Sequence, residues 1–208
     1  MSRKIDLAKI AKSSTVEVRR SLRMYRKICF GTDHNVNRWA SQFAAVEVHA
    51  AWERYSEKRV IAALNHNASV FLNENSVKGV TRISSGLASY IVRGGRNFFD
   101  FKSSADLIRI GNRLLGPLNN PFLRLTTQQR QYLDCLNAIR NFIVHRSDAA
   151  DQSYRKSLRT LYRLRFVPDP PEFLNTIDKR SDSPARGDRR IVSFVQIVYD
   201  AIEQTAKP

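Results

Sequence analysis

Apolar residues recur every three or four positions along one long stretch of the chain. Val36, Trp39 and Phe43 begin the pattern, which continues to Leu64. Because this spacing places side chains on one face of an α-helix, the pattern predicts a single amphipathic helix over about 34–65. We expect the stripe that begins with Trp39 and Phe43 to lie in the core of the protein.

Most of the remaining chain has the same helical spacing, interrupted by helix start and stop signals. Thr126 and Gln129 have the spacing of a capping box, and Asp33 is a suitable N-cap for the long helix. No segment alternates apolar and polar residues with the period of two that a half-buried strand requires. The sequence therefore predicts an all-α bundle. Further helices are expected at about 79–92, 104–115, 152–165 and 191–202 and after Thr126.

Composition divides the chain into a basic helical N-terminal extension, residues 1–32, and a helical domain, residues 33–208. The extension carries nine Lys or Arg against two acidic residues. Inside the domain, Pro168 and the prolines after it end a helix. Residues 167–190 are basic and rich in turn-forming residues, so we expect them to form a flexible loop.

The chain is strongly basic. Its 208 residues include 35 Lys and Arg against 19 Asp and Glu, a formal net charge of +16, and 25 of the basic residues are Arg. Basic patches gain affinity for polyanions by releasing counterions from phosphates, and guanidinium groups bind phosphate oxygens in pairs. The charge favours a nucleic-acid partner over the alternative that it serves only solubility.

Other features narrow the class of protein. No run of 18 apolar residues is present, and the N-terminus lacks the apolar stretch of a signal peptide. Cys29 and Cys135 are 106 positions apart, and no set of His, Cys, Asp and Glu has metal-ligand spacing. We therefore expect a soluble, cytoplasmic protein with no membrane contact, no metal and no cofactor.

One short segment carries residues suited to chemistry. Arg140 and Asn141 come five and four positions before His145. An imidazole titrates near neutral pH and can move protons, and a guanidinium can stabilise charge that develops on a phosphate. Arg59 and His66 have a similar spacing, but an apolar residue follows Arg59 where a polar one follows Arg140.

This Arg-Asn-x3-His pattern resembles the signature of the HEPN superfamily, whose active members are mostly metal-independent endoribonucleases. Such proteins place the motif on a late helix of an α-helical bundle, after a long early helix. The segment around Trp52 and Glu53 resembles the early helix of the ribonuclease L-type and toxin-like branch. The resemblance covers about residues 39–165 and implies a HEPN-like helical bundle that acts on RNA.

The resemblance also implies a role for each motif residue. RNA is cleaved when its 2′-hydroxyl attacks the adjacent phosphorus, which requires proton transfer and stabilisation of negative charge. His145 would move the proton, Arg140 would bind the phosphate, and Asn141 would orient the imidazole or bind a phosphate oxygen. Glu53 and Arg146 would support these groups. The expected RNA-binding residues on the next helix are Arg155, Arg159 and Arg163.

Each motif residue also has a structural explanation. His145 would then be an ordinary exposed residue, and Asn141 would bind backbone near a helix end. Arg140 would form a salt bridge to an acidic residue of the long helix, either Glu53 or Glu47. An ion pair of that kind is compatible with catalysis, because it would also orient the guanidinium.

Helix geometry separates the two charged groups of the motif. Arg140 and His145 are five positions apart, which places them about 140° apart around an ideal helix. A kinked helix end would bring them together within one chain, and a symmetric dimer would bring two motifs together across one cleft. The family resemblance favours a homodimer with the active site at its interface.

The sequence therefore predicts a metal-independent endoribonuclease. The resemblance implies a toxin of a toxin–antitoxin or phage-defence system, with an antitoxin or another inhibitory protein as partner. Two alternatives stay open. The first is a non-catalytic HEPN-type module that binds RNA, a nucleotide or a partner protein. The second is a basic helical DNA-binding or scaffold protein in which the motif is accidental.

Overall fold

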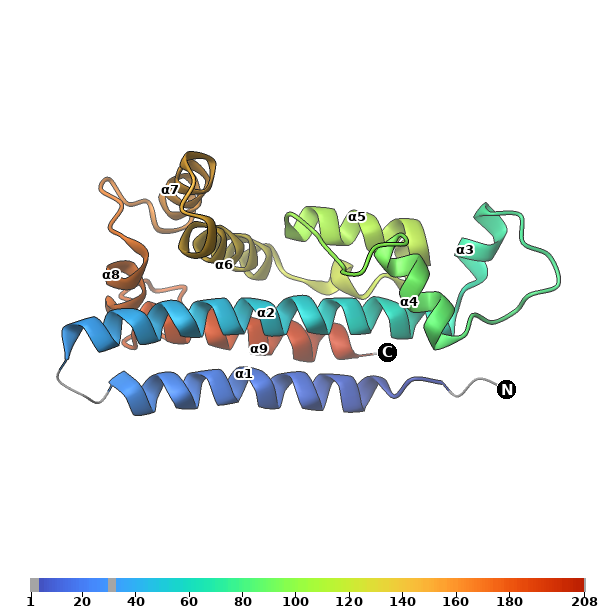
Figure 1. Ribbon diagram of the computed structural model, residues 1–208, viewed down its shortest axis with the longest axis horizontal. Coiled ribbons are helices and arrows are strands. Elements are labelled where there is room, and N and C mark those ends of the chain that lie inside the picture. The colour runs from blue at the N-terminus through green and yellow to red at the C-terminus, as the bar shows by residue number, and fades with distance from the viewer. Residues whose placement is uncertain (1–3, 30–32, 208) are drawn as a thin grey trace. The chain divides into compact units, whose positions relative to one another are not determined.

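The computed structural model in Figure 1 describes residues 4–29 and 33–207. The prediction of an all-α protein is confirmed, since the described residues form helices and only one isolated β-bridge, between Ile177 and Arg189. None of the described helices is both long and apolar enough to cross a membrane. The α-helices are α1 (Leu7–Cys29), α2 (His34–His66), α3 (Ser69–Glu74), α4 (Ser85–Arg93), α5 (Ser104–Leu115), α6 (Thr127–His145), α7 (Asp148–Tyr162), α8 (Pro170–Asn175) and α9 (Arg190–Ala206), with the 3₁₀ helices η1 (Pro117–Asn119) and η2 (Pro121–Arg124).

The predicted starts of α2 and α6 are confirmed by their caps. The Asp33 carboxylate accepts a hydrogen bond from the N–H of Asn35 at 2.7 Å. Thr126 Oγ1 accepts from the N–H of Gln129 at 3.1 Å, and Gln129 Oε1 accepts from the N–H of Thr126 at 2.9 Å. These bonds satisfy backbone donors that the first helical turn leaves unpaired.

Two helices begin at other residues than predicted, again because of capping. α4 begins only at Ser85, since Ser84 Oγ accepts from the N–H of Leu87 at 3.3 Å. α7 begins four residues early, at Asp148, since Ser147 Oγ accepts from the N–H of Ala150 at 3.3 Å. In both cases a serine in a polar segment is the N-cap residue and sets the start of the helix.

The chain forms two compact units. The first unit comprises Met1–Ser14, Trp52–Leu125 and Ile202–Pro208, and the second comprises Thr15–Ala51 and Thr126–Ala201. The helices α1, α2 and α9 contribute residues to both. The expected division at residues 32 and 33 is not one of these boundaries and stays a prediction, and residues 30–32 lie outside the described part of the chain.

The core of the first unit is aromatic and aliphatic. Trp52 is 2% exposed and meets the ring of Phe122 edge to face, with centroids 6.2 Å apart. Gly111 of α5 lies directly against the buried Asn120. The Asn120 side chain donates to Ile108 O at 2.9 Å and accepts from the N–H of Phe122 at 3.0 Å. Asn120 thereby joins α5 to η2, which makes the close approach at Gly111 necessary.

The core of the second unit is an aromatic cluster, and two arginine guanidinium groups stack over its rings. Tyr162 and Phe173 meet edge to face with centroids 4.9 Å apart. The Arg180 guanidinium lies 4.7 Å from the Tyr162 ring centre, and the Arg190 guanidinium lies 4.6 Å from the Phe173 ring centre. Cation–π contacts of this kind hold both arginines in the structure of the unit. Within the same unit α6 packs against α7, as Figure 1 shows.

The segment 167–190, expected to be a loop, contains the helix α8 and a hydrogen-bonded connection after it. Asp178 is 1% exposed, and its carboxylate accepts from the hydroxyls of Ser183 at 2.9 Å and Ser193 at 3.1 Å. The backbone N–H of Asp178 donates to Asp188 O at 2.7 Å. A buried carboxylate satisfied in this way ties the basic segment to α9, which composition alone does not reveal.

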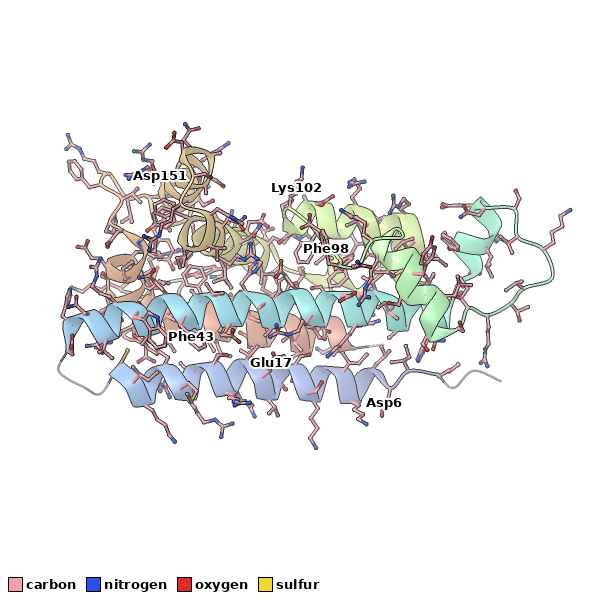
Figure 2. All side chains as sticks on the ribbon, viewed as in Figure 1. Asp6, Glu17, Phe43, Phe98, Lys102 and Asp151 are labelled. Carbon is pink, nitrogen blue, oxygen red and sulfur yellow. The ribbon has the colours of Figure 1, made fainter. Side chains whose placement is uncertain are left out.

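The start of the apolar stripe of α2 lies outside the core, contrary to prediction, whereas its later members Trp52, Val60 and Leu64 are buried. Trp39 is 58% exposed and Phe43, labelled in Figure 2, is 42% exposed, and their rings stack with centroids 5.4 Å apart. A different face of α2 packs instead, through Ala40, Ala44 and Val48, each at most 1% exposed. Small side chains let neighbouring helices approach closely, so the alanine face is buried and the bulky face is left to solvent.

We predict that Gly111→Ala lowers the free energy of unfolding by about 1–3 kcal/mol, because the new methyl group overlaps the Asn120 side chain. Gly86→Ala is the matched control within the same unit. Its Cβ meets nothing within 4 Å, so alanine raises stability by about 0.5 kcal/mol through its helix preference. Urea denaturation of both variants measures the difference, and equal effects would contradict the packing of α5.

The two tryptophans should differ in fluorescence quenching. Trp39 is 58% exposed and Trp52 is 2% exposed, so acrylamide should quench a Trp52→Phe variant strongly and a Trp39→Phe variant weakly. Repeating the titration at high protein concentration tests whether a second copy covers α2. Strong quenching of both variants would contradict the burial of Trp52.

Candidate functional site

The motif residues lie on the last turns of α6. Tyr132, Leu136 and Ile139 bury one face of this helix at no more than 1% exposure, which fixes its rotation in the second unit. The opposite face is polar. Because positions four apart are neighbours on a helix, Asn137, Asn141 and His145 form one row on that face, with Arg140 and Val144 in the row beside it.

Side-chain hydrogen bonds organise the start of this row. Arg140 Nη1 donates to Asn141 Oδ1 at 2.8 Å, and Asn141 Nδ2 donates to Asn137 Oδ1 at 3.2 Å. All three side chains are half-buried. Asn141 therefore holds the guanidinium of Arg140 in place and uses only one of its five N–H donors, so the others are left for an anion.

His145 ends α6 and is exposed. The next residue, Arg146, adopts the left-handed conformation with φ 47°, and its N–H donates to Phe142 O at 3.1 Å. Within the described chain, the side chains of His145 and Arg146 make no hydrogen bond or ion pair. Both are therefore accessible to a ligand.

The arrangement of Arg140 and His145 follows from the regularity of α6. The helix is unbroken from Thr127 to His145, and the backbone departs from helical geometry only at Arg146. The structure therefore shows no interruption of the helix between Arg140 and His145 that would bring the two side chains together. Within one chain the two side chains leave the helix about 140° apart.

The other match to the bare spacing, Arg59 and His66, is structural. Arg59 is 6% exposed, and its Nε donates to Thr205 O at 2.8 Å. Burial lowers the pKa of the Arg59 guanidinium. His66 Nε2 lies 2.6 Å from Ile5 O. This pair holds chain termini within the first unit, whereas Arg140 and His145 face solvent.

The supporting residues are spread over the chain. Glu53 belongs to the first unit and the motif to the second, so an ion pair between Glu53 and Arg140 stays a prediction. On α7, the carboxylate of Asp151, labelled in Figure 2, accepts from Arg155 Nε at 2.7 Å and raises the pKa of that guanidinium. Arg159 and Arg163 are exposed, and Arg163 caps the end of α7.

A cleft of about 420 Å³ opens beside the C-terminal end of α6, within the second unit. Its walls come from Phe142, Ile143 and Arg146 of α6, from Arg38 and Gln42 of α2, and from the start of α8. Sequence reasoning singled out Arg146 but missed Arg38 and Gln42, because α2 meets α6 only through the fold and carries no local signal of binding.

Other chemistry-bearing groups are placed less favourably. Cys135 is 1% exposed on the buried face of α6, and burial raises the pKa of its thiol, which keeps it protonated and unreactive. Among the described residues, no group of three or more His, Cys, Asp and Glu side chains is arranged to hold a metal ion.

Comparisons with protein-family models, with curated proteins and with solved structures find no match to this chain. The candidate site is therefore defined by the α6 residues Arg140, Asn141 and His145 and by the adjoining cleft.

Proposed function

We propose that this protein is a metal-independent endoribonuclease in which Arg140, Asn141 and His145 carry the reaction. One observation supports the proposal most. A guanidinium is held in place by a neighbouring amide on the same helix that ends in an accessible imidazole. A phosphate ligand that is already oriented and a proton-transfer group are what cleavage of an RNA phosphodiester requires.

The reaction uses the RNA's own nucleophile. His145 takes the proton of a 2′-hydroxyl while the 2′-oxygen attacks the adjacent phosphorus, and the bond from phosphorus to the 5′-oxygen breaks. The leaving 5′-oxygen takes up a proton from water, and His145 later returns its proton to the solvent, so the products are a 2′,3′-cyclic phosphate and a 5′-hydroxyl. Arg140 offsets the negative charge that develops on the phosphoryl oxygens, while Asn141 keeps the guanidinium in position.

The proposal includes a homodimer with the reactive groups of two copies at one interface. Since α6 is a continuous helix between Arg140 and His145, the two groups of one chain diverge. A two-fold assembly of α6 helices would place Arg140 of one copy near His145 of the other. Val144, which is 50% exposed in the same surface, would then be covered.

The remaining exposed arginines would position the RNA. Arg155 and Arg159 of α7 and Arg163, which caps that helix, lie in the same unit as the motif and contribute to the net charge of +16. Contacts from such side chains to phosphates give affinity without sequence selectivity. By the family resemblance, the biological role we propose is that of a toxin in a toxin–antitoxin or phage-defence system, held in check by an inhibitory protein.

We expect the purified protein to cleave RNA in the presence of EDTA, and His145→Ala and Arg140→Ala each to slow cleavage by about 10²–10⁴-fold, because each removes a group needed at the transition state. Gel analysis of a labelled RNA and mass spectrometry of the 2′,3′-cyclic ends give the measurement. His34→Ala is the matched control, since His34 is also an exposed histidine at a helix end.

Undiminished cleavage by His145→Ala would rule out the mechanism. An intact protein that binds RNA without cutting it would instead be a non-catalytic binding module. Preference for duplex DNA would favour a DNA-binding or scaffold protein.

A mixed dimer tests whether two copies share the site. His145→Ala and Arg140→Ala chains are co-expressed with different tags and purified through both. If each site takes its Arg140 and its His145 from different copies, the mixed dimer has one intact site and recovers about half of the parent activity. If each chain holds a complete site, the mixed dimer stays as inactive as either variant alone.

A further inference from the structure

The cleft beside the end of α6 has apolar walls held rigidly in place. Phe142 and Ile143 of α6 face it together with Pro170 and Pro171, which are buried at the start of α8. The Phe142 ring stacks on the ring of Tyr154, with centroids 5.1 Å apart and planes 15° from parallel. Tyr154 is 1% exposed and donates to Pro168 O at 2.8 Å, so the aromatic wall has little freedom.

The cleft also has a small set of polar groups. Gln42 Nε2 donates to Arg38 O at 3.4 Å, which leaves one N–H and the amide oxygen of Gln42 without a partner in the described chain. The Arg38 guanidinium pairs with the Asp169 carboxylate, and both are partly exposed. An apolar slot with a few fixed donors and acceptors is the usual form of a small-molecule site, and its volume of about 420 Å³ lies within the range of such sites.

The guanidinium of Arg146 at the rim of the cleft makes no ion pair within the described residues, and Arg146 is exposed. Its left-handed backbone, with φ 47°, caps α6 and places the side chain one residue after His145. A flat apolar slot next to an unpaired guanidinium suits a nucleotide, with the base in the slot and the phosphate on the arginine.

We propose that this cleft binds one nucleotide of the RNA beside the cleaved bond and so gives the enzyme a base preference. The base packs between the Phe142 side and the proline side of the cleft, and Gln42 reads its edge. The phosphate of the same nucleotide binds Arg146, which brings the next phosphodiester toward His145. This assignment of a base-reading subsite rests on the proposed RNA cleavage, but the cleft itself can be tested without cleavage.

Binding of the four nucleoside 5′-monophosphates, of ribose 5-phosphate and of inorganic phosphate to the full-length His145→Ala protein tests the subsite by calorimetry. We expect at least one nucleotide to bind about tenfold or more tightly than ribose 5-phosphate. Arg146→Asn, which tolerates the left-handed backbone, should weaken that nucleotide by about tenfold or more through loss of a charged hydrogen bond. Arg186→Asn removes the same charge from an exposed arginine of the same unit outside this cleft and should leave binding unchanged.

Two further variants address the base. Gln42→Ala should reduce the difference in affinity among the four nucleotides, and Ile143→Trp should block the slot. Because Ile143→Trp risks misfolding, its circular dichroism spectrum and unfolding midpoint are measured first, and Gln42→Ala carries the test if they are not those of the parent.

Equal affinity for nucleotides and ribose 5-phosphate would overturn the base-reading subsite, even if the parent protein cleaves RNA. Nucleotide binding that depends on Arg146 and Gln42, in a protein that never cleaves RNA, would leave the subsite standing and refute the proposed endoribonuclease. If both hold, the parent enzyme should cut a random RNA pool next to the nucleotide that binds best, and Gln42→Ala should weaken that preference.

Discussion

Close packing of the alanine face of α2 determines much of what this protein presents to a ligand. Ala40, Ala44 and Val48 are buried because small side chains let the helix approach its neighbours in the second unit. This rotation of α2 leaves Trp39 exposed and brings Arg38 into the wall of the cleft beside α6. If α2 were rotated so that Trp39 and Phe43 faced the core, the indole of Trp39 would be buried and Arg38 would leave the wall of the cleft.

The second constraint is the continuity of α6 from Thr127 to His145. Its buried face, with Tyr132 and Ile139, makes the helix a fixed part of the second unit, so the rotation per residue decides where the motif side chains go. Arg140 is held by Asn141, while His145 projects from the last turn. A rigid helix therefore presents a phosphate ligand and a proton-transfer group in two directions, which is an arrangement that a symmetric assembly uses well and a single chain uses poorly.

Local signals in the sequence predicted where the helices lie along the chain better than they predicted which helix faces are buried. The capping box at Thr126 was predictable, since it depends on residues three apart. The buried face of α2 was not, because both faces are apolar and only the neighbouring segments select one.

The helix α8 was missed for a different reason. Pro170 reads as the end of a helix, but proline also suits the first turn, and Asp169 caps that turn by accepting from the N–H of Glu172 at 3.4 Å. Likewise, the cleft brings Arg38 and Gln42 of α2 next to the end of α6, about 100 positions later in the chain, so these two residues had no local pattern to reveal them.

The arginine content, which first suggested a phosphate-bearing partner, includes side chains that serve the fold. Arg59 is buried against a backbone carbonyl, and Arg180 and Arg190 lie over aromatic rings of the second unit. Such arginines are held by contacts within the protein, so net charge overstates the surface available to RNA. What distinguishes Arg140 and Arg146 is the state of the guanidinium. The Arg140 guanidinium is oriented by the amide of Asn141 and keeps N–H donors for a ligand, whereas the Arg146 guanidinium makes no ion pair within the described residues. Both arginines lie within two helical turns of the exposed imidazole of His145. A function in phosphate chemistry is therefore better argued from these two side chains than from the charge of +16.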